Sequence, residues 1–563
     1  MGTSSHDGHD RTLAGIAVST GVVAGPVARL ATPPVLGPDS GPEPDTAAAV
    51  ELAGKALDAV AADLDARAAT VSGQAAEVLS TQALMARDPA LAGRIGDALR
   101  QGRSLPHAVS EAFGTFREAL AAAGGYFAER AADLDDLRDR AVAWLRGEPM
   151  PGVPDPGHPY VLVAGDLAPA DTATLDRERV LAIVTERGGP TSHTAILATA
   201  LGIPAVVACP RAAGLTDGQR VLVDGDNGTV RVDPTTAEVQ QAVGQADARR
   251  AAQAQAHGPG RTADGKPVAL LVNLGAAGEL AAASAADSEG VGLLRTEFLY
   301  LGRRDAPSQA EQRRAYAEVF SAFAGRKVVV RTLDAGADKP LPFIEHGDEP
   351  NPALGVRGLR LDRRDPALLD TQLAAVAQAA ADAPDTQVWV MAPMVATPAE
   401  ARDFAGRVHR HGLPVAGTMV EVPAAALRAD AVLAGCDFAS IGTNDLGQYT
   451  LAADRMSGEL ADLLDPWQPA LLELVRLTAQ AGVRSGKPVG VCGQAASDPL
   501  LALVLVGLGV TSLSMSPGAL PAVRSTLARH TADECAALAE SALRAPDAQA
   551  ARASVHASAH QPT

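Results

Sequence analysis

The spacing of apolar residues changes character along the chain. Between residues 13 and 30, short apolar stretches are interrupted by glycines, which is typical of strands joined by tight turns. From about residue 46 to residue 146, apolar side chains recur every three or four positions, and this period predicts a bundle of antiparallel helices. Strand-like runs return at 160–163 and continue to about residue 232. The pattern therefore predicts an α/β domain interrupted by an inserted α-helical bundle.

A regular alternation of apolar runs and helical segments follows residue 261. The eight apolar runs cover residues 268–274, 290–297, 328–333, 388–394, 414–422, 438–441, 489–492 and 513–515. Ala- and Leu-rich segments with helical spacing separate most of them, and eight β/α units in about 285 residues predict a C-terminal TIM (β/α)8 barrel. An open doubly wound sheet is the alternative. We find neither a GxxxxGKS/T motif nor a GxGxxG motif after a strand, which favours the closed barrel.

These differences in the spacing of apolar residues divide the chain into regions. An α/β domain is expected from two segments that flank the bundle, and a linker helix joins it to the barrel. The tail is expected to be disordered, because its polar, alanine-rich sequence shows little sign of an apolar stripe. We expect the α/β domain at 1–35 and 147–234, with the bundle at 36–146 between its two segments. The linker helix is expected at 235–260, the barrel at 261–545 and the tail at 546–563.

Length and composition narrow the class of protein. The 563 residues suffice for three or four domains of ordinary size. No apolar stretch reaches the roughly 18 to 20 uncharged residues that cross a bilayer, so we expect a soluble cytoplasmic protein without membrane insertion. A net charge of −18 disfavours nucleic acid as a partner but suits a small basic protein. The four cysteines form no CxxC pair, which indicates neither a disulfide framework nor a thiolate zinc site.

One histidine stands in a sequence that suits phosphate chemistry. The apolar run 180–184 is followed by the motif GGPTSHT at 188–194, and a segment with helical spacing comes next. A glycine turn that leads into a helix exposes backbone N–H groups, which bind an anionic phosphoryl group. An imidazole titrates near neutral pH and can act as a nucleophile, so His193 is a candidate phosphate carrier. A histidine that only caps a helix is the alternative for this motif taken alone.

Polar residues stand at the ends of most barrel runs, where enzymes with this fold assemble their sites. Arg295 and Arg331 stand in this group, and with Arg357, in the loop-to-helix stretch 351–357, they can form planar forks around phosphate and carboxylate groups. Arg455 is a further candidate. Glu421 and Asp445 offer hard oxygen ligands for a Mg²⁺ ion that also binds substrate oxygens. Surface ion pairs and helix caps are the alternatives for each of these residues by itself.

Several motifs together resemble one known family. They are GGPTSHT at 188–194, LRTEFL at 294–299, RTLD at 331–334, MVEVP at 419–423, IGTNDL at 441–446 and VCG at 491–493. The chain resembles Enzyme I of the bacterial sugar phosphotransferase system, the phosphoenolpyruvate-protein phosphotransferases, from about residue 15 to residue 520. The helical segment 129–136 is also similar to the bundle of that family.

The resemblance implies the reaction and the partners. The phosphoryl group of phosphoenolpyruvate is expected to pass to His193 and then to a histidine of the phosphocarrier protein HPr, with release of pyruvate. The swivelling phosphohistidine domain would correspond to 1–35 with 147–234, and the HPr-binding bundle to 36–146. The resemblance also implies a homodimer that forms through the phosphoenolpyruvate-binding barrel.

It also implies roles for single residues. Phosphate and carboxylate of the substrate are expected to bind Arg295, Arg331, Arg357, Asn444 and Arg455. Glu421 and Asp445 would bind Mg²⁺, since phosphoryl transfer depends on positioning and charge neutralisation. Loss of the phosphate leaves an enolate that must be protonated at carbon, and Cys492 is the candidate proton donor. A cysteine that is only a small buried apolar residue is the alternative.

Two other functions stay open at this point. Pyruvate phosphate dikinase and phosphoenolpyruvate synthase share the histidine and barrel motifs but carry an additional nucleotide-binding domain, for which no segment remains here. A non-catalytic phosphorelay scaffold would keep the fold without the chemistry. The complete set of Arg, Glu, Asp and Cys candidates argues against the scaffold.

Overall fold

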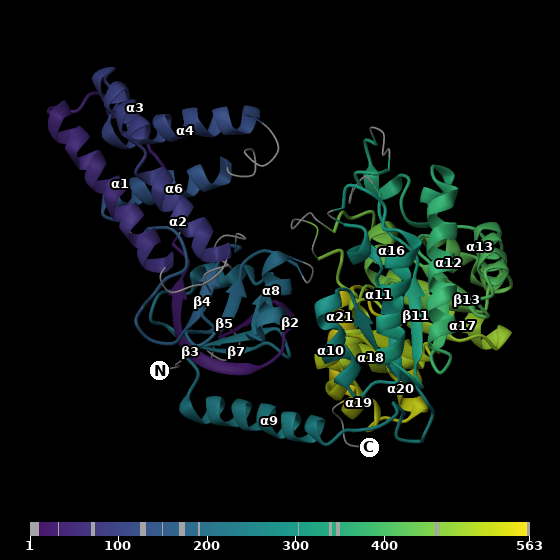
Figure 1. Cartoon of the computed structure of the whole chain (residues 1–563). Coiled ribbons are helices and arrows are strands. Elements are labelled where there is room, and N and C mark those ends of the chain that lie inside the picture. Colours follow the sequence, from purple (N-terminus) through teal and green to yellow (C-terminus); the bar gives the residue numbers. More distant parts are fainter. Residues whose placement is uncertain are drawn as a thin grey trace, which may run out of the picture. The chain divides into compact units, whose positions relative to one another are not determined.

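The computed structural model describes residues 11–31, 33–68, 74–123, 131–148, 150–167, 175–189, 192–301, 303–336, 341–344, 349–455, 460 and 462–559 (Figure 1). The chain divides into two compact units, Met1–Ala246 and Asp247–Thr563. Within the described residues, no helix has both the length and the apolar character needed to span a membrane.

The first unit contains an eight-stranded mixed sheet with the strand order β1-β8-β7-β3-β4-β5-β6-β2. Its strands are β1 (Thr12–Ala14), β2 (Ile16–Ser19), β3 (Val22–Arg29), β4 (Tyr160–Ala164), β5 (Val180–Thr185), β6 (Ala205–Val207), β7 (Arg220–Asp224) and β8 (Thr229–Val232). From β3 to β6 the strands run parallel. Side chains of β4 and β5 enter the cores on both faces of this sheet, which explains why these strands are continuously apolar.

A helical bundle is inserted between β3 and β4. Its helices are α1 (Thr46–Ala68), α2 (Gln74–Ala86), α3 (Pro89–Arg100), α4 (Leu105–Ala123) and α6 (Ala131–Arg146). The bundle has its own core, in which Leu64, Ile95 and Phe113 are buried. The Asp88 side chain caps α3 by accepting a hydrogen bond from the Ala90 N–H at 2.8 Å. The three- and four-residue spacing therefore predicted the helices correctly.

Two more helices complete the first part of the chain. α8 (His193–Leu201) follows β5 and contributes Ala198 to one core of the sheet. α9 (Thr236–Ala254) occupies most of the segment expected to be a linker helix. Its Ala246 is buried together with Val22 and Leu222 of the sheet.

The second unit is a closed barrel of eight parallel strands, as predicted. They are β9 (Ala269–Leu274), β10 (Gly290–Leu294), β11 (Lys327–Arg331), β12 (Gln387–Ala392), β13 (Ala416–Val420), β14 (Phe438–Ile441), β15 (Val489–Val491) and β16 (Ser512–Met515). β16 pairs with β9 and closes the barrel, with Leu513 opposite Leu270. Each of the eight apolar runs overlaps one of these strands, and three of the strands begin one residue before the run. The sheet closes on itself, so the prediction of a barrel rather than an open sheet is confirmed.

Helices surround the strands and form the main core with them. They are α10 (Leu280–Ala285), α11 (Gln309–Ala322), α12 (Pro366–Asp382), α13 (Pro398–Arg410), α14 (Pro423–Leu427), α15 (Ala429–Leu433), α16 (Thr443–Leu451), α17 (Pro469–Ser485), α18 (Pro499–Gly507), α19 (Leu520–Leu527), α20 (Ala532–Leu543) and α21 (Ala548–Ala559). A smaller cluster fills the inside of the barrel, where Met391, Met419 and Cys492 are buried.

The C-terminal tail differs from the prediction. The composition of 546–563 predicts disorder, but α21 is a helix that packs against α20. Ala548, Ala551 and Val555 are buried, and their spacing places them on one face of α21. Alanine forms helices well and needs little space, so an alanine stripe can be buried without standing out as apolar in the sequence. Residues 560–563 lie outside the described part of the chain.

Candidate active site

The carboxyl end of the barrel carries the residues predicted from the motifs. Arg331 is the last residue of β11, and Arg295, Glu421 and Cys492 directly follow β10, β13 and β15. Asn444 and Asp445 lie in the first turn of α16, which begins just after β14. Parallel strands place their carboxyl ends at the same rim of the barrel, so side chains from distant motifs meet there.

Two buried arginines share one buried carboxylate at this rim. Asp334 Oδ2 lies 3.1 Å from Arg331 Nη1 and 3.0 Å from Arg357 Nη2. Arg331 Nη2 also pairs with Glu297 at 3.1 Å, and the other Glu297 oxygen accepts the Asp334 N–H at 3.0 Å. Burial lowers the pKa of both guanidinium groups, but the neighbouring carboxylates raise it by more, so both arginines stay charged.

Arg331 and Arg357 also have buried polar atoms that take no part in these ion pairs. The Nε atoms of Arg331 and Arg357 are buried and have no hydrogen-bond partner within the described residues. The buried hydroxyl of Thr443, at the start of α16, is in the same condition. A buried donor without a partner is unfavourable by about 1–3 kcal/mol. An oxyanion that accepts these hydrogen bonds would therefore stabilise the site.

The other two predicted arginines are less enclosed. Arg455 Nη1 lies 3.4 Å from Asp445 Oδ2, while Asp445 Oδ1 lies 3.1 Å from Arg357 Nη1. Asp445 thus connects two of the candidate arginines. Arg295 is exposed, and no carboxylate among the described residues lies within ion-pair distance of its guanidinium. This leaves its charge available to a ligand.

Glu421 is the most buried acid of the site, with 1% of its surface exposed. Its Oε2 accepts the Met394 N–H at 2.9 Å, and its Oε1 lies 4.0 Å from Arg331 Nη1. Burial raises the pKa of Glu421, and the charges of Asp445 and Asp334 raise it further. The charge of Arg331 offsets these effects only in part, and a bound cation would offset them further.

The donor set fits Mg²⁺ better than a metal held entirely by the protein. Within the described residues, no group of three or more His, Cys, Asp and Glu side chains is arranged to hold a metal ion. Mg²⁺ commonly uses one or two carboxylates together with water and substrate phosphate oxygens. Glu421 and Asp445 match that requirement in number and in chemistry.

Cys492 lies inside the barrel, where its thiol is almost completely buried. The Ser440 hydroxyl donates a hydrogen bond to its Sγ at 3.1 Å. The Asn273 amide donates to the Cys492 carbonyl at 3.2 Å, and Asn444 Oδ1 accepts the Gln494 N–H at 3.1 Å. Burial raises the pKa of the thiol to about 11, so it carries its proton at neutral pH.

The turn before α8 differs from the barrel rim, because glycines and a serine cap shape it rather than buried ion pairs. Gly188 adopts a φ of +95°, which a side chain would disfavour, and the Ser192 N–H donates to the Gly189 carbonyl at 2.9 Å. The Ser192 hydroxyl accepts the Ala195 N–H at 3.3 Å and caps α8, which begins at His193. The imidazole of His193, together with Pro190 and Thr191, lies outside the described part of the structure.

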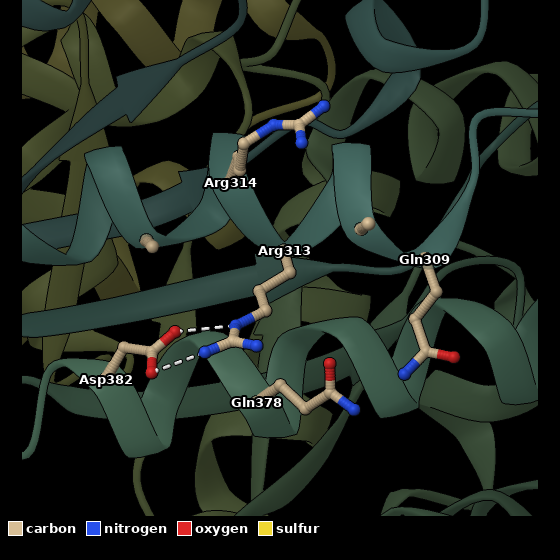
Figure 2. A pocket seen from close by; sticks show the side chains of 7 residues that line it. Gln309, Arg313, Arg314, Gln378 and Asp382 are labelled. Atoms are coloured by element: carbon tan, nitrogen blue, oxygen red, sulfur yellow. Dashed lines mark hydrogen bonds and ion pairs between the residues drawn. The ribbon is translucent and has the colours of Figure 1, made fainter.

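A hollow of about 600 Å³ lies on the outer face of the barrel, between α11 and α12 (Figure 2). Gln309, Arg314 and Gln378 line it, and Arg313 makes two hydrogen bonds with Asp382, at 2.7 and 2.8 Å. None of the residues predicted from the motifs lines this hollow. The Arg313–Asp382 ion pair is exposed, whereas the ion pairs of Asp334 at the strand ends are buried.

Sequence reasoning missed the residues that hold the candidates in place. Asp334 and Glu297 belong to quoted motifs, and their position next to Arg331 and Arg295 was an available signal. Ser440 and Tyr449 gave a weaker signal. Ser440 lies one position before the end of β14, and Tyr449 follows Asn444 by five residues on the same helix.

Comparison with known proteins identifies the family of this chain. Three family models match the chain: "PEP-utilising enzyme, N-terminal" at residues 14–130, "PEP-utilising enzyme, mobile domain" at 156–228 and "PEP-utilising enzyme, PEP-binding domain" at 249–532. The last model covers the barrel and about half of the chain. The chain therefore belongs to the PEP-utilising enzymes.

Full-length relatives narrow the class further. A phosphoenolpyruvate-protein phosphotransferase of Streptomyces coelicolor is 52% identical over 97% of this chain and 99% of its own length. One of Haloferax volcanii is 40% identical over 83% of this chain and 84% of its own. One of Geobacillus stearothermophilus is 36% identical over 95% and 96%. The predicted family, Enzyme I, and the predicted enzyme class, phosphoenolpyruvate-dependent phosphotransfer, are confirmed.

Proposed function

We propose that phosphoenolpyruvate binds at the carboxyl end of the barrel and passes its phosphoryl group to His193, which then phosphorylates a histidine of HPr. The observation that carries this proposal is the pair Arg331 and Arg357. Both are charged and buried, and each has an Nε–H that finds no partner among the described residues. Such an arrangement suits a small polyanion, because its oxygens provide the missing acceptors.

The substrate is held by side chains at or after the carboxyl ends of three barrel strands, β10, β11 and β14. Arg331 and Arg357 bind it from the buried side, and Arg295 and Arg455 from the more open side. Asn444 assists from the start of α16, where backbone N–H groups also favour negative charge. Guanidinium groups bind phosphate and carboxylate in a planar, bidentate manner, so they orient the donor as well as neutralise it.

We further propose that Glu421 and Asp445 hold Mg²⁺. When bound, the ion would neutralise charge on the transferring phosphoryl group and on the leaving oxygen. The protein contributes the two carboxylates and a buried environment, in which electrostatic interactions are strong. The positive charge would also offset the burial and the repulsion by Asp445 and Asp334 that raise the pKa of Glu421.

Cys492 is proposed as the proton donor to the enolate that remains after phosphoryl transfer. Its thiol keeps its proton at neutral pH, because burial raises its pKa to about 11. Ser440 orients the sulfur from the neighbouring strand, at 3.1 Å. Protonation of the enolate carbon gives pyruvate and makes the transfer hard to reverse. The remaining thiolate regains a proton from solvent before the next turnover.

His193 is proposed as the phosphoryl acceptor. It stands at the first position of α8, where the N–H groups of the first turn carry partial positive charge. The Thr194 hydroxyl donates to Asp166 Oδ1 at 3.3 Å and connects the helix start to the loop after β4.

The proposed partners and domains follow the family resemblance. The bundle at 36–146 would bind HPr, and its separate core and insertion point support an independent role. Segments 1–35 and 147–234 would carry the phosphohistidine, 235–260 would link them to the barrel, and the barrel would form a homodimer. Exposed Leu301 and Leu354, in the loops after β10 and β11, support a contact surface there.

Four free cysteines support a reducing, cytoplasmic location.

The experiment that tests the function uses phosphoenolpyruvate labelled in its phosphoryl group. Wild-type protein with Mg²⁺ should incorporate one label per chain on His193, located by mass spectrometry, and should pass it to HPr. The variant His193→Ala should incorporate none. Label that appears only when labelled ATP is the donor would instead indicate a dikinase, and no label from either donor would indicate a scaffold.

A further inference from the structure

The phenol of Tyr449 connects two elements of the candidate site. It lies on α16, five residues after Asn444 and four after Asp445. Its oxygen accepts a hydrogen bond from Arg357 Nη1 at 3.4 Å. The same hydroxyl donates its proton to the carbonyl of Ala353. One oxygen atom therefore contacts the guanidinium of Arg357 and the backbone of the loop that carries it.

The loop around Arg357 depends on side chains for its shape. Arg357 does not belong to a barrel strand, and it follows a short 3-10 turn, Pro352–Leu354, that ends at Gly355. The Val356 N–H donates to the Glu349 carboxylate at 3.1 Å. Arg360 Nη1 donates to the carbonyls of Leu354 and Gly355 at 3.3 and 3.2 Å, and Tyr449 adds a connection to α16 through the Ala353 carbonyl. Without it, the segment between residues 353 and 357 keeps fewer contacts with the rest of the rim.

The charge of Arg357 does not depend on Tyr449. Asp334 and Asp445 pair with its two Nη atoms at 3.0 and 3.1 Å, and both carboxylates are buried. Removal of the phenol would leave these ion pairs in place. The hydroxyl therefore acts on the position of the loop that carries Arg357, and not on whether the guanidinium is present or charged.

We propose that Tyr449 is a positioning residue, which holds the Arg357 loop against α16 and so aligns the Arg357 guanidinium with the phosphoenolpyruvate oxygens. This inference rests on the proposed function, in which Arg357 binds the substrate. Because Tyr449 acts on binding geometry, its loss weakens substrate binding and leaves the transfer step nearly unchanged. Loss of uniform binding raises KM without lowering kcat.

The test is the substitution Tyr449→Phe, which removes the hydroxyl and keeps the ring. We expect KM for phosphoenolpyruvate to rise about tenfold, with kcat within twofold of wild type, since a hydrogen bond from a charged group is lost. Tyr160→Phe is the matched control. It removes a hydroxyl that donates to the Pro154 carbonyl at 2.7 Å in the first unit, and it should leave KM unchanged.

A double-mutant cycle separates positioning from a general structural effect. If Tyr449 acts through Arg357, Tyr449→Phe should add little to the KM of Arg357→Lys, because the aligned fork is already lost. An equal increase in both backgrounds would overturn the proposal. It would also be overturned if Tyr449→Phe left KM unchanged, or if it lowered kcat as strongly as it raised KM.

A binding measurement keeps this inference separate from the identity of the phosphoryl acceptor. The affinity of phosphoenolpyruvate with Mg²⁺ is measured by calorimetry in the His193→Ala background, with and without Tyr449→Phe. A tenfold weaker Kd with Tyr449→Phe supports the positioning role even if another residue accepts the phosphoryl group. Equal affinities overturn it, even when wild-type protein is labelled on His193.

Discussion

The two regions proposed to handle the phosphoryl group are built in opposite ways. At the barrel rim, Arg331, Arg357 and Asp334 form buried ion pairs at 3.0 to 3.1 Å. At the turn before α8, glycines, a serine cap and the first turn of a helix offer backbone N–H groups. The barrel site is organised by charge, and the carrier turn is organised by backbone geometry.

The difference corresponds to two tasks. A site that breaks the phosphoenolpyruvate bond must hold a polyanion in one orientation, and buried charges do this because they cannot rearrange easily. Such charges cost free energy to bury, so each is paired with a carboxylate. A carrier must release its phosphoryl group to a second acceptor, and weak, neutral N–H donors suit that role. The following variants test this contrast.

The largest effect is expected for Cys492→Ala. Pyruvate formation should fall by about 10²- to 10⁴-fold, because general acid catalysis to the enolate is lost. Pyruvate release is measured under multiple turnover with HPr present. Cys436→Ala is the control, since it removes another buried thiol of the barrel, which hydrogen-bonds to the Val432 carbonyl at 3.5 Å. An unchanged rate for Cys492→Ala would contradict its role as proton donor.

A smaller but still large effect is expected for Arg331→Lys. The charge stays, but the planar fork between Glu297 and Asp334 is lost, so kcat/KM should fall by about 10²-fold. Arg313→Lys is the matched control on the outer face of the barrel, where a similar fork pairs with exposed Asp382 (Figure 2). It should change kcat/KM by less than twofold. Equal losses of kcat/KM in the two variants would contradict the expected difference between a buried and an exposed guanidinium–carboxylate pair.

Ser192→Ala tests the carrier turn. The variant loses the cap of α8, which is worth about 1 kcal/mol, and the rate of phosphorylation from phosphoenolpyruvate should fall by about fivefold. Rapid-quench measurement of labelled protein follows this rate. Ser308→Ala removes the cap of α11 in the barrel and should cost similar stability without slowing phosphorylation. A 100-fold loss for Ser192→Ala would mean that the serine hydroxyl contacts the phosphoryl group directly.

The smallest effect concerns stability and pH. The pKa of Glu421 is raised in the folded state above its ordinary value of 4.5, so its ionisation destabilises the fold as pH rises through the range above 4.5. Without Mg²⁺, Glu421→Gln should therefore raise Tm by about 2–4 °C at pH 8 and by less at pH 5. Thermal unfolding at both pH values measures the difference. A larger gain at pH 5 than at pH 8 would contradict the raised pKa.

Much of the barrel could be predicted because its sequence repeats one physical requirement. Each strand is enclosed by side chains on two sides and must be short and apolar, as 290–294 and 489–491 illustrate. Chemistry then collects where the strands end, so Arg331, Glu421 and Cys492 could be singled out. The tail was predicted wrongly, because a buried alanine face such as that of α21 carries almost no apolar contrast.

The sequence by itself determined the order of the domains, the number of barrel strands and the residue types at their carboxyl ends, since these depend on local spacing and composition. Only the tertiary structure decided that Asp334 joins Arg331 to Arg357, that Ser440 orients the Cys492 thiol, and that Tyr449 holds a loop 96 residues away from it in the chain. These contacts depend on where closure of the barrel places each strand end. That placement is a property of the whole barrel, and no single motif contains it.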